Sequence, residues 1–466
     1  MQWMTRVKDF FGVQDMTVGR PMNKLIQFSL PLLIGNLAQQ LYNTVDSIVV
    51  GKYIGDTALA AVGTAGPILN LLLVLLIGVS TGASIIASQY FGAKDREGLS
   101  RVVGSTIILT LVSGILMTVV GYFASPLLIG LVAPPADVAE GAIIYLKIIF
   151  IGMLGVAAYN IFAGVLRGIG DSFYPVVYLI IACLLNIVLD VLFVARFGMG
   201  VAGVAWATII AQAISGVLCL IRLVGMKDLI DINRTTLVPD GPITRKLCTL
   251  GLHAGITQAL FSMSAIVVQG LTNSLGTAVI AANVAVMRVD GFAMMPNFTF
   301  GTASTTFVGQ NIGARRVDRV RAGVKDLIKL ALGTAGVLVA CILLFGHGLI
   351  GLFTDTEDVI TIGIHGLRWL SLGYIAFAVS QVLQGAMRGA GETMVPMWIS
   401  IITTIVIRLP LAYLLAALTR SEAWPKGNPE AIFASLLISW LLGMVMTVIT
   451  YRRGAWKRRL PEDLRG

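Results

Sequence analysis

Charged residues are scarce in this sequence. Only 12 % of its 466 residues are Asp, Glu, Lys or Arg, whereas 56 % are hydrophobic and the mean hydropathy is +0.87. A soluble globular protein carries about 25 % charged residues, which it needs to cover its water-facing surface. A chain of this length is also too large for one compact soluble core. The scarcity of charge therefore excludes a soluble protein and indicates a membrane protein.

Cysteine and histidine are also few. The four cysteines lie in apolar surroundings without CxxC spacing, so we expect core residues rather than disulfides or metal ligands: Cys183, Cys219, Cys248 and Cys341. The three histidines are scattered at positions 253, 347 and 365. The sequence contains no P-loop and no GxSxG motif. We therefore expect no enzyme activity, no cofactor and no direct use of ATP.

Long apolar runs dominate the chain instead. A helix needs about 20 apolar residues to cross the hydrocarbon core. Twelve segments reach this length, at 25–50, 57–88, 102–130, 140–165, 173–195, 201–224, 247–274, 277–308, 326–354, 367–387, 394–417 and 430–451. Inside a bilayer only helices and closed barrels satisfy their backbone, and barrel strands would alternate in polarity, which these runs do not. The predicted fold class is an all-α membrane protein with 12 transmembrane helices.

Positive charge predicts the orientation of these helices. Most of the 34 Lys and Arg residues fall in alternate connections and in the two tails. The positive-inside rule then places both termini in the cytoplasm of a bacterium or archaeon, with the chain in the inner membrane. The net charge of +10 is explained by this topology and by attraction to the lipid bilayer, so we expect no nucleic-acid partner.

An internal repeat relates the two halves. The segment Arg167-Gly168-x-Gly170-Asp171 recurs as Arg388-Gly389-x-Gly391-Glu392, and Gln89-x-x-Gly92-Ala93 recurs as Gln310-x-x-Gly313-Ala314, both at an offset of 221 residues. Six spans separate the copies, so both halves insert in the same direction. This pattern predicts two pseudo-twofold-related six-helix bundles with a central cleft, which is chiefly a transporter arrangement. A duplicated channel or scaffold is the alternative.

The repeat also sets the predicted domain boundaries. We expect a cytoplasmic N-terminal tail at 1–24, an N-lobe of spans one to six at 25–225 and a cytoplasmic connector at 226–245. A C-lobe of spans seven to twelve at 246–451 and a basic cytoplasmic tail at 452–466 follow. The Arg-Gly-x-Gly segments lie in connections, where glycine permits a tight reversal, so we interpret them as turns.

Carboxylates within spans are candidate functional groups, because burying one costs about 2.5–3.5 kcal/mol on insertion scales. Asp46 lies on a polar stripe of the first span that also contains Gln39 and Asn43. In the fifth span Asn186 and Asp190 are one helical turn apart. Such a pair of acids could hold a proton or Na⁺. The alternative is that Asp46 and Asp190 are wet interfacial residues, since each lies six residues from a flanking cation.

The eighth span contains a third acid, Asp290, and a set of soft apolar side chains. Asp290 is interpreted either as a contact for a cationic substrate or as one member of a buried ion pair with Arg408. Met287, Phe292 and Met294 would suit a promiscuous apolar cation through soft packing and cation–π contact. Ordinary helix packing is the alternative for these three. The predicted substrate cleft therefore comprises Gln39, Asn43, Asp290, Met287, Met294 and Phe292.

These features together resemble the multidrug and toxic compound extrusion (MATE) family over nearly the whole chain. The resemblance rests on the twelve spans in two halves, Asn43-x-x-Asp46, the two Gln-x-x-Gly-Ala segments, the two Arg-Gly-x-Gly turns and Asn186-x-x-x-Asp190. It implies export of amphipathic, often cationic small molecules, driven by inward H⁺ or Na⁺ flow through alternating access of the lobes. A lipid-linked sugar or lipid flippase of the same superfamily is the alternative, and we expect a monomer.

The pattern is most similar to the DinF-like branch of that family. In this branch the resemblance implies a cation-coupling cluster in the N-lobe at Asp46, Tyr145, Asn186, Asp190 and Thr208. Another branch uses a glutamate in span seven, and this sequence has none between Lys246 and Thr272. We expect H⁺ rather than Na⁺ as the coupling ion, and no metal other than Na⁺ at Asp46 and Asp190.

Overall fold

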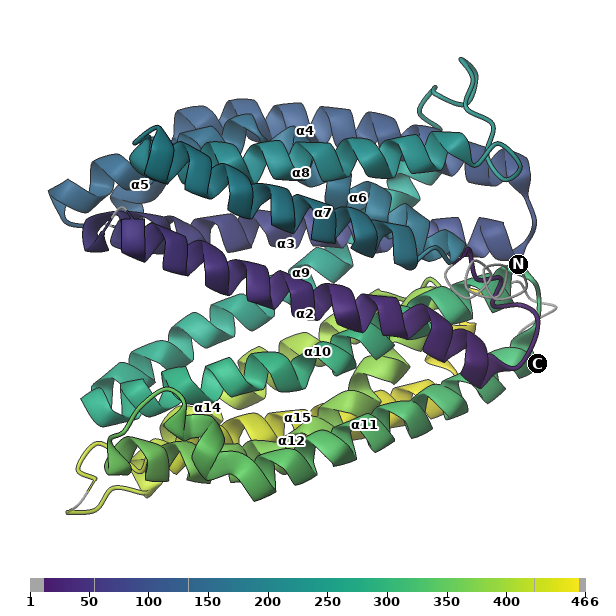
Figure 1. Ribbon diagram of the computed structural model, residues 1–466. Helices are drawn as coiled ribbons and strands as arrows, with labels where there is room; N and C mark the ends of the chain where they lie inside the picture. The colour runs from purple at the N-terminus through teal and green to yellow at the C-terminus, as the bar shows by residue number, and fades with distance from the viewer. Residues whose placement is uncertain (1–11, 54, 133, 423, 461–466) are drawn as a thin grey trace, which may run out of the picture. The chain divides into compact units, whose positions relative to one another are not determined.

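The structure is a computed structural model that describes residues 12–53, 55–132, 134–422 and 424–460. The side chains of residues 42–52, 56, 59 and 137 are outside this description. The described residues form helices and connections without a strand (Figure 1). The prediction of an all-α protein is confirmed.

Each predicted span coincides with a helix or with a helix interrupted once. The spans of the first half are α2 (Pro21–Tyr53), α3 (Asp56–Gly92), α4 (Arg96–Val132), α5 (Ala136–Ile151) with α6 (Met153–Ile169), α7 (Phe173–Asp190) with η1 (Val191–Arg196), and α8 (Gly200–Gly225). Those of the second half are α9 (Gly241–Ser274), α10 (Thr277–Gly313), α11 (Val317–Gly351), α12 (Glu357–Gly389), α13 (Met394–Ile401) with η2 (Ile402–Ile407) and α14 (Arg408–Leu418), and α15 (Glu430–Arg452). A short helix, η3 (Ala455–Lys457), follows the last span.

Length and composition identify these helices as membrane spans. Ten helices of the described residues are long and apolar enough to cross a bilayer, and the bent pair α5–α6 makes an eleventh. α2 is outside this count, and many of its side chains are outside the description. The chain is therefore a multi-pass membrane protein.

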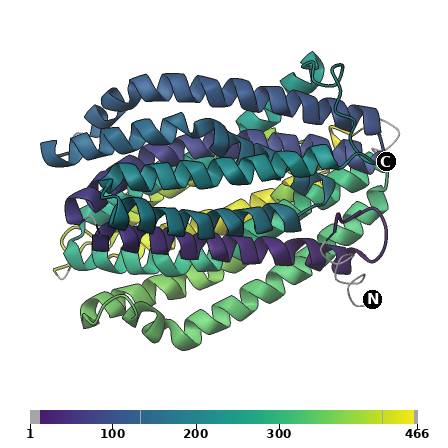
Figure 2. The same ribbon diagram turned by 45° about the horizontal axis from the view of Figure 1, so that its top comes forward.

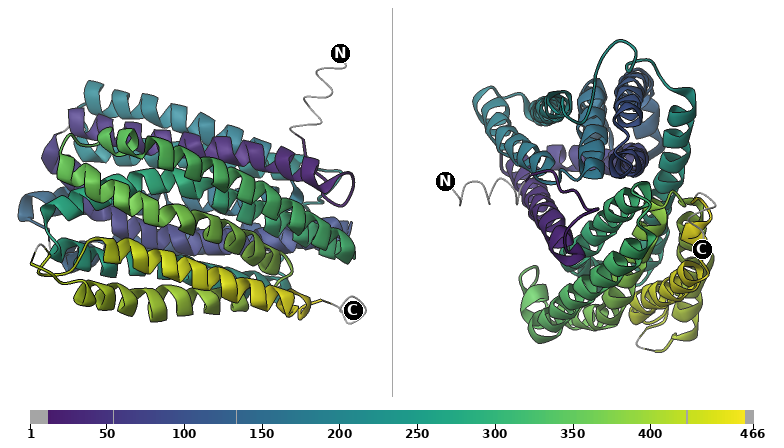
Figure 3. Two further views of the ribbon diagram at one scale, coloured as in Figure 1. Left: turned by 90° about the horizontal axis from the view of Figure 1, so that it is seen from below. Right: turned by 90° about the vertical axis from the view of Figure 1, so that its right-hand side faces the viewer.

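The described residues divide into two compact units. Unit 1 comprises residues 12–16 with Ile26–Gly255, and unit 2 comprises Thr17–Leu25 with residues 256–460. In unit 1, α6 packs against α3, α4 and α8, and α8 also packs against α5 and α7. In unit 2, α12 packs against α10, α11 and α15, and α14 packs against α15. Figure 2 and the end-on view in Figure 3 show the helices of each unit as a bundle.

The same helix crossing is built into both units. A Cβ atom at Gly164 of α6 would lie 2.6 Å from the Ser80 carbonyl oxygen of α3, and one at Gly385 of α12 would overlap the Gly301 carbonyl oxygen of α10. Gly385 follows Gly164 by the repeat offset of 221 residues, and Gly301 follows Ser80 by the same offset. Glycine is required at both crossings because it alone lets the backbones approach so closely. The sequence repeat is therefore also a repeat of tertiary packing.

The fourth span differs from the continuous helix that its apolar run predicts. α5 and α6 meet at Gly152 with a bend of 53°. A side chain at Gly152 would overlap Ile209 of α8, so the bend lies at a point of close helix contact. The cysteines also differ in part from expectation: Cys183 and Cys219 are buried, whereas Cys248 and Cys341 are exposed. An exposed cysteine on a span is compatible with lipid, which is as apolar as a core.

Candidate functional site

The two polar residues predicted on the fifth span are both buried in unit 1. Asp190 is 0 % exposed and Asn186 is 1 % exposed. Asp190 is the last residue of α7, and the helix continues directly into the π-helical turn η1. π-turns of this kind are rare, and they are frequent at functional sites. This burial does not fit the alternative of Asp190 as a wet interfacial residue.

Two further residues of the predicted cation cluster lie on α8, which packs against α7, and on α5, which packs against α8. Tyr145 of α5 is buried at 6 % exposure. Thr208 of α8 is half-buried, and its Oγ1 donates a hydrogen bond of 3.0 Å to the Val204 carbonyl. α8 packs against both α5 and α7. The structure therefore places Tyr145, Asn186, Asp190 and Thr208 on three helices of one bundle.

The structure describes fewer of the predicted site residues in the first span. The side chains of Asn43 and Asp46 lie outside the described residues. Gln39 of α2 is half-buried. The roles of these three residues stay predictions.

A second polar cluster lies in unit 2 around Asp290. The carboxylate of Asp290 interacts electrostatically with two polar groups. These are the Tyr374 hydroxyl of α12 and the Arg408 guanidinium of α14. Arg408 Nη1 donates a hydrogen bond of 3.1 Å to Ser264 Oγ of α9. Within the described residues, Asp290 makes no ion pair shorter than 4.0 Å, and its Oδ1 is buried without a hydrogen-bond donor. The charge of Arg408 therefore acts on Asp290 without an ion pair within 4.0 Å, and both interpretations of Asp290 stay predictions.

The apolar side chains predicted beside Asp290 fall into two groups. Met287 and Phe292 are 55 % and 46 % exposed. Met294 is buried in the core of unit 2 with Tyr374 and Phe377. Met294 therefore has the environment of a packing residue, and Met287 and Phe292 have surface that a substrate or lipid can contact.

The acidic residue of each repeated turn has a structural role in addition to the reversal that the glycines permit. Asp171 accepts hydrogen bonds from the Tyr174 backbone N–H at 3.2 Å and from Arg222 Nε at 3.0 Å. Burial raises the pKa of the Asp171 carboxyl, and the charge of Arg222 opposes that rise. Arg222 belongs to α8, the last span of the first half. The turn thus fastens the start of α7 to the last span of its own half.

The copy of this turn in unit 2 makes equivalent contacts with other residues. Glu392 Oε1 accepts hydrogen bonds from the backbone N–H groups of Met394 and Val395, at 3.1 and 3.2 Å. Its Oε2 lies 3.5 Å from Arg459 Nε, just beyond the last span. Arg459 does not follow Arg222 by the repeat offset, so aligning the halves could not have identified these partner arginines.

Comparisons with known proteins agree with this architecture. A family model described as MatE matches residues 31–192 and 254–414. The chain is 31 % identical over 443 residues to the probable multidrug resistance protein YoeA of Bacillus subtilis, covering 93 % of each chain. It is 26 % identical to the probable multidrug resistance protein NorM of Thermotoga maritima, covering 94 % of this chain and 93 % of the relative. These relatives are described as resistance proteins and not as enzymes.

Solved structures support the same assignment. An outward-facing multidrug resistance MATE family transporter of the MOP superfamily matches with a TM-score of 0.88 at 25 % identity, over 95 % of this chain and 98 % of that chain. A MOP superfamily transporter from Pyrococcus furiosus matches with a TM-score of 0.88 at 26 % identity, over the same shares. The DinF-like branch stays a prediction. Because the family model matches both halves and a relative is 31 % identical across nearly its whole length, this chain belongs to the MatE family of membrane transporters.

Proposed function

We propose that this protein is a secondary antiporter that exports amphipathic, often cationic small molecules and is driven by H⁺ entering the cell. The observation that carries this proposal is the complete burial of Asp190, one turn from the buried Asn186, in a membrane-spanning helix of unit 1. Named relatives are multidrug resistance proteins, which supports the substrate class. The sequence has no P-loop for ATP, which supports an ion gradient as the source of energy.

The chemistry follows from the cost of burying charge. A carboxylate inside a membrane protein is far less costly when neutral than when charged, unless a cation accompanies it. Asp190 can therefore bind a proton from one side of the membrane and must find a partner or water to release it. Asn186 supplies an amide on the same helical face, which can hydrogen-bond to either form. We propose that Asp46, Tyr145 and Thr208 complete this coupling site, as the family resemblance implies.

In this scheme proton binding changes the relative stability of two conformations. A ligand shifts such an equilibrium only through its different affinity for the two states. Protonation at Asp190 and substrate binding in the predicted cleft would favour opposite states, so proton entry would drive substrate export. Met287, Phe292 and Asp290 are the proposed substrate contacts in unit 2.

The proposal is tested with purified protein in phospholipid vesicles loaded with a fluorescent organic cation. An H⁺ gradient and a Na⁺ gradient are imposed separately, each without the other. We expect the H⁺ gradient alone to drive transport and a protonophore to stop it. Transport driven only by Na⁺ would overturn the choice of H⁺, and transport that follows the cation's own gradient under every condition would overturn antiport.

A further inference from the structure

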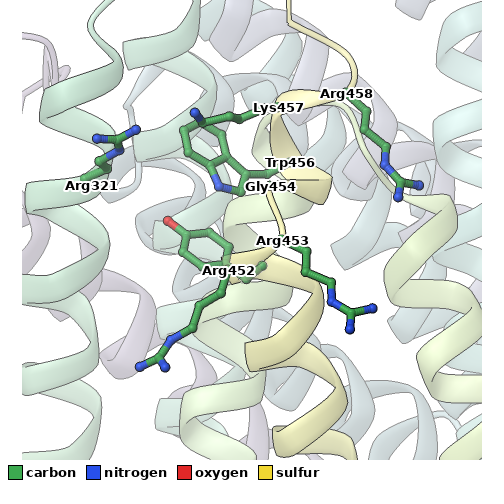
Figure 4. Close-up of a pocket in the computed structure, with 8 residues that line it drawn as sticks. Arg321, Arg452, Arg453, Gly454, Trp456, Lys457 and Arg458 are labelled. Atoms are coloured by element: carbon green, nitrogen blue, oxygen red, sulfur yellow. The ribbon is translucent and has the colours of Figure 1, made fainter. Parts of the chain in front are cut away.

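The end of the last span forms a strongly basic pocket. Eight residues line a cavity of about 730 Å³ (Figure 4): Arg321, Tyr451, Arg452, Arg453, Gly454, Trp456, Lys457 and Arg458. Arg321 comes from α11, and the others from the end of α15 and the turn after it. The lining contains five cationic side chains and no carboxylate. We call this cavity the basic pocket.

The turn that forms the basic pocket is anchored in unit 2. Trp456 is 3 % exposed, and its ring stacks on Tyr451 at 5.9 Å with an interplanar angle of 18°. Gly454 makes the reversal with φ of 76°, a left-handed conformation that favours glycine. Beyond the pocket, Arg459 pairs with Glu392. The positive-inside rule requires only charge at this end of a span, not a turn held by a buried indole and an ion pair.

The carboxylate that pairs with this terminal segment contacts a residue outside the pocket. Glu392 pairs with Arg459, which does not line the cavity. Arg321, Arg452 and Arg453 are exposed side chains that present guanidinium groups to the pocket region. Guanidinium groups bind phosphate with two parallel hydrogen bonds and are the preferred partners of such anions. The chemistry of the pocket therefore selects a phosphate-bearing ligand.

The position of the pocket distinguishes a lipid from a free ion. Arg452 is the last residue of a membrane span, so the turn lies at the level of the lipid headgroups. Tyr and Trp side chains favour this interface because one end of the ring system is apolar and the other is polar. In Figure 4 the guanidinium groups of Arg321 and Arg452 lie on one side of the turn, and those of Arg453 and Arg458 on the other. Charges spread in this way suit an extended headgroup better than one small ion.

We propose that the basic pocket is a binding site for the phosphate-containing headgroup of an anionic phospholipid. Arg321 and Arg452, whose guanidinium groups lie on the same side of the turn, bind the phosphate. Arg453, on the other side, donates hydrogen bonds to the remaining oxygens of the extended headgroup, and Tyr451 with Trp456 forms the apolar support beneath it. The site uses none of the residues assigned to ion coupling or to substrate. It therefore stands independently of the proposed transport function.

The test measures lipid retention by native mass spectrometry of the full chain in detergent, titrated with phosphatidylglycerol or phosphatidylcholine. The pocket variant is Arg321→Gln/Arg452→Gln/Arg453→Gln. The matched control, Lys227→Gln/Arg234→Gln/Arg245→Gln, removes three exposed cations from the connector and the start of α9. We expect the pocket variant to bind phosphatidylglycerol at least about tenfold more weakly than the unmodified protein and the control variant. Phosphatidylcholine binding should not distinguish the three proteins.

Three outcomes would overturn the proposal. These are equal phosphatidylglycerol retention by the pocket variant and the unmodified protein, equal loss in the control variant, and displacement of the lipid by inorganic phosphate at the same concentration as the lipid, which would indicate a site for the free ion. If the triple variant does not fold, Arg452→Gln alone is measured in the same way. The single change should weaken phosphatidylglycerol binding about fivefold, and unchanged binding would contradict the assignment.

Discussion

The Asp171 carboxylate accepts a hydrogen bond of 3.0 Å from Arg222 Nε, which joins the turn before α7 to the last span of the same half. Glu392 and Arg459 form the corresponding pair in unit 2. The two acids occupy the same place in the sequence repeat, whereas the two arginines do not. The first half thus ties this turn to its final helix, and the second half ties it to the segment just after its final helix.

Breaking the first of these pairs should destabilise the protein. Arg222→Gln removes the charged donor and leaves the buried Asp171 carboxylate with backbone donors alone, those of Tyr174 and Phe173. We expect the free energy of unfolding to fall by about 2 kcal/mol, the range for a hydrogen bond to a charged group. The thermal unfolding midpoint in detergent measures the loss. Lys329→Gln, which breaks an exposed pair with Asp326, is the control and should change little. Equal midpoints for all three proteins would show that the pair does not contribute.

A methyl group at the α10–α12 crossing should also be destabilising. Gly385→Ala places a Cβ atom inside the van der Waals radius of the Gly301 carbonyl oxygen, which is backbone and cannot turn aside. We expect a loss of about 1–3 kcal/mol from overpacking, measured as a lower unfolding midpoint. Gly333→Ala in α11 is the matched control, because nothing lies within 4 Å of its Cβ position. If the unfolding midpoint of Gly385→Ala equalled that of the control, the two helices would be able to move apart without loss of stability, which would contradict the prediction.

Neutralising Asp190 should uncouple transport without unfolding the protein. Asp190→Asn keeps the shape of the side chain and removes the group that binds the proton. We expect H⁺-driven efflux of a fluorescent cation from vesicles to be lost, with the unfolding midpoint unchanged. Asn186→Ala should have a milder effect. Asp318→Asn removes an exposed carboxylate at the start of α11 and serves as the control. Full H⁺-driven export by the Asp190→Asn variant would contradict the proposed coupling role of Asp190.

The two interpretations of Asp290 predict different results for one pair of variants. If Asp290 contacts a cationic substrate, Asp290→Asn should raise the KM for that substrate, and adding Arg408→Gln should not restore it. If instead Asp290 serves to neutralise Arg408, Asp290→Asn should lower the unfolding midpoint, and the double variant should recover it. We expect the first result, because the carboxylate lies beyond ion-pair distance from the guanidinium. The second result would assign the pair to structure.

The span pattern could be predicted from the sequence because the bilayer leaves a chain few choices. Twenty apolar residues must form a helix there, so the helix positions followed from composition alone. The bend at Gly152 and the π-turn after Asp190 could not be predicted in this way. Both lie inside uniformly apolar runs, where no change of periodicity marks a break. At Gly152 the bend coincides with a close approach to Ile209 of α8, which the apolar run itself does not reveal.

The residues of the candidate sites also divide into those that the sequence could predict and those that it could not. Acidic residues within predicted spans could be identified in the sequence because a charge there is costly. Of these, Asp190 is fully buried. The neighbours of Asp290 on α12 and α9, Tyr374 and Ser264, carried no signal in the sequence. Neither lies at a helical spacing from Asp290, so only the folded chain brings them together.

The assignment of α9 to both units has a consequence for how the chain could be divided between genes. A chain cut in the connector would yield a C-terminal fragment that begins with Gly241–Gly255, yet this stretch packs within unit 1, where Gly251 lies against Gly78 of α3. Thr17–Leu25 of the N-terminal fragment belongs in turn to unit 2, where Arg316 donates a hydrogen bond of 2.6 Å to the Thr17 carbonyl. Each fragment would complete the other, so two co-expressed halves should assemble by exchange of helix ends, as in split-protein complementation.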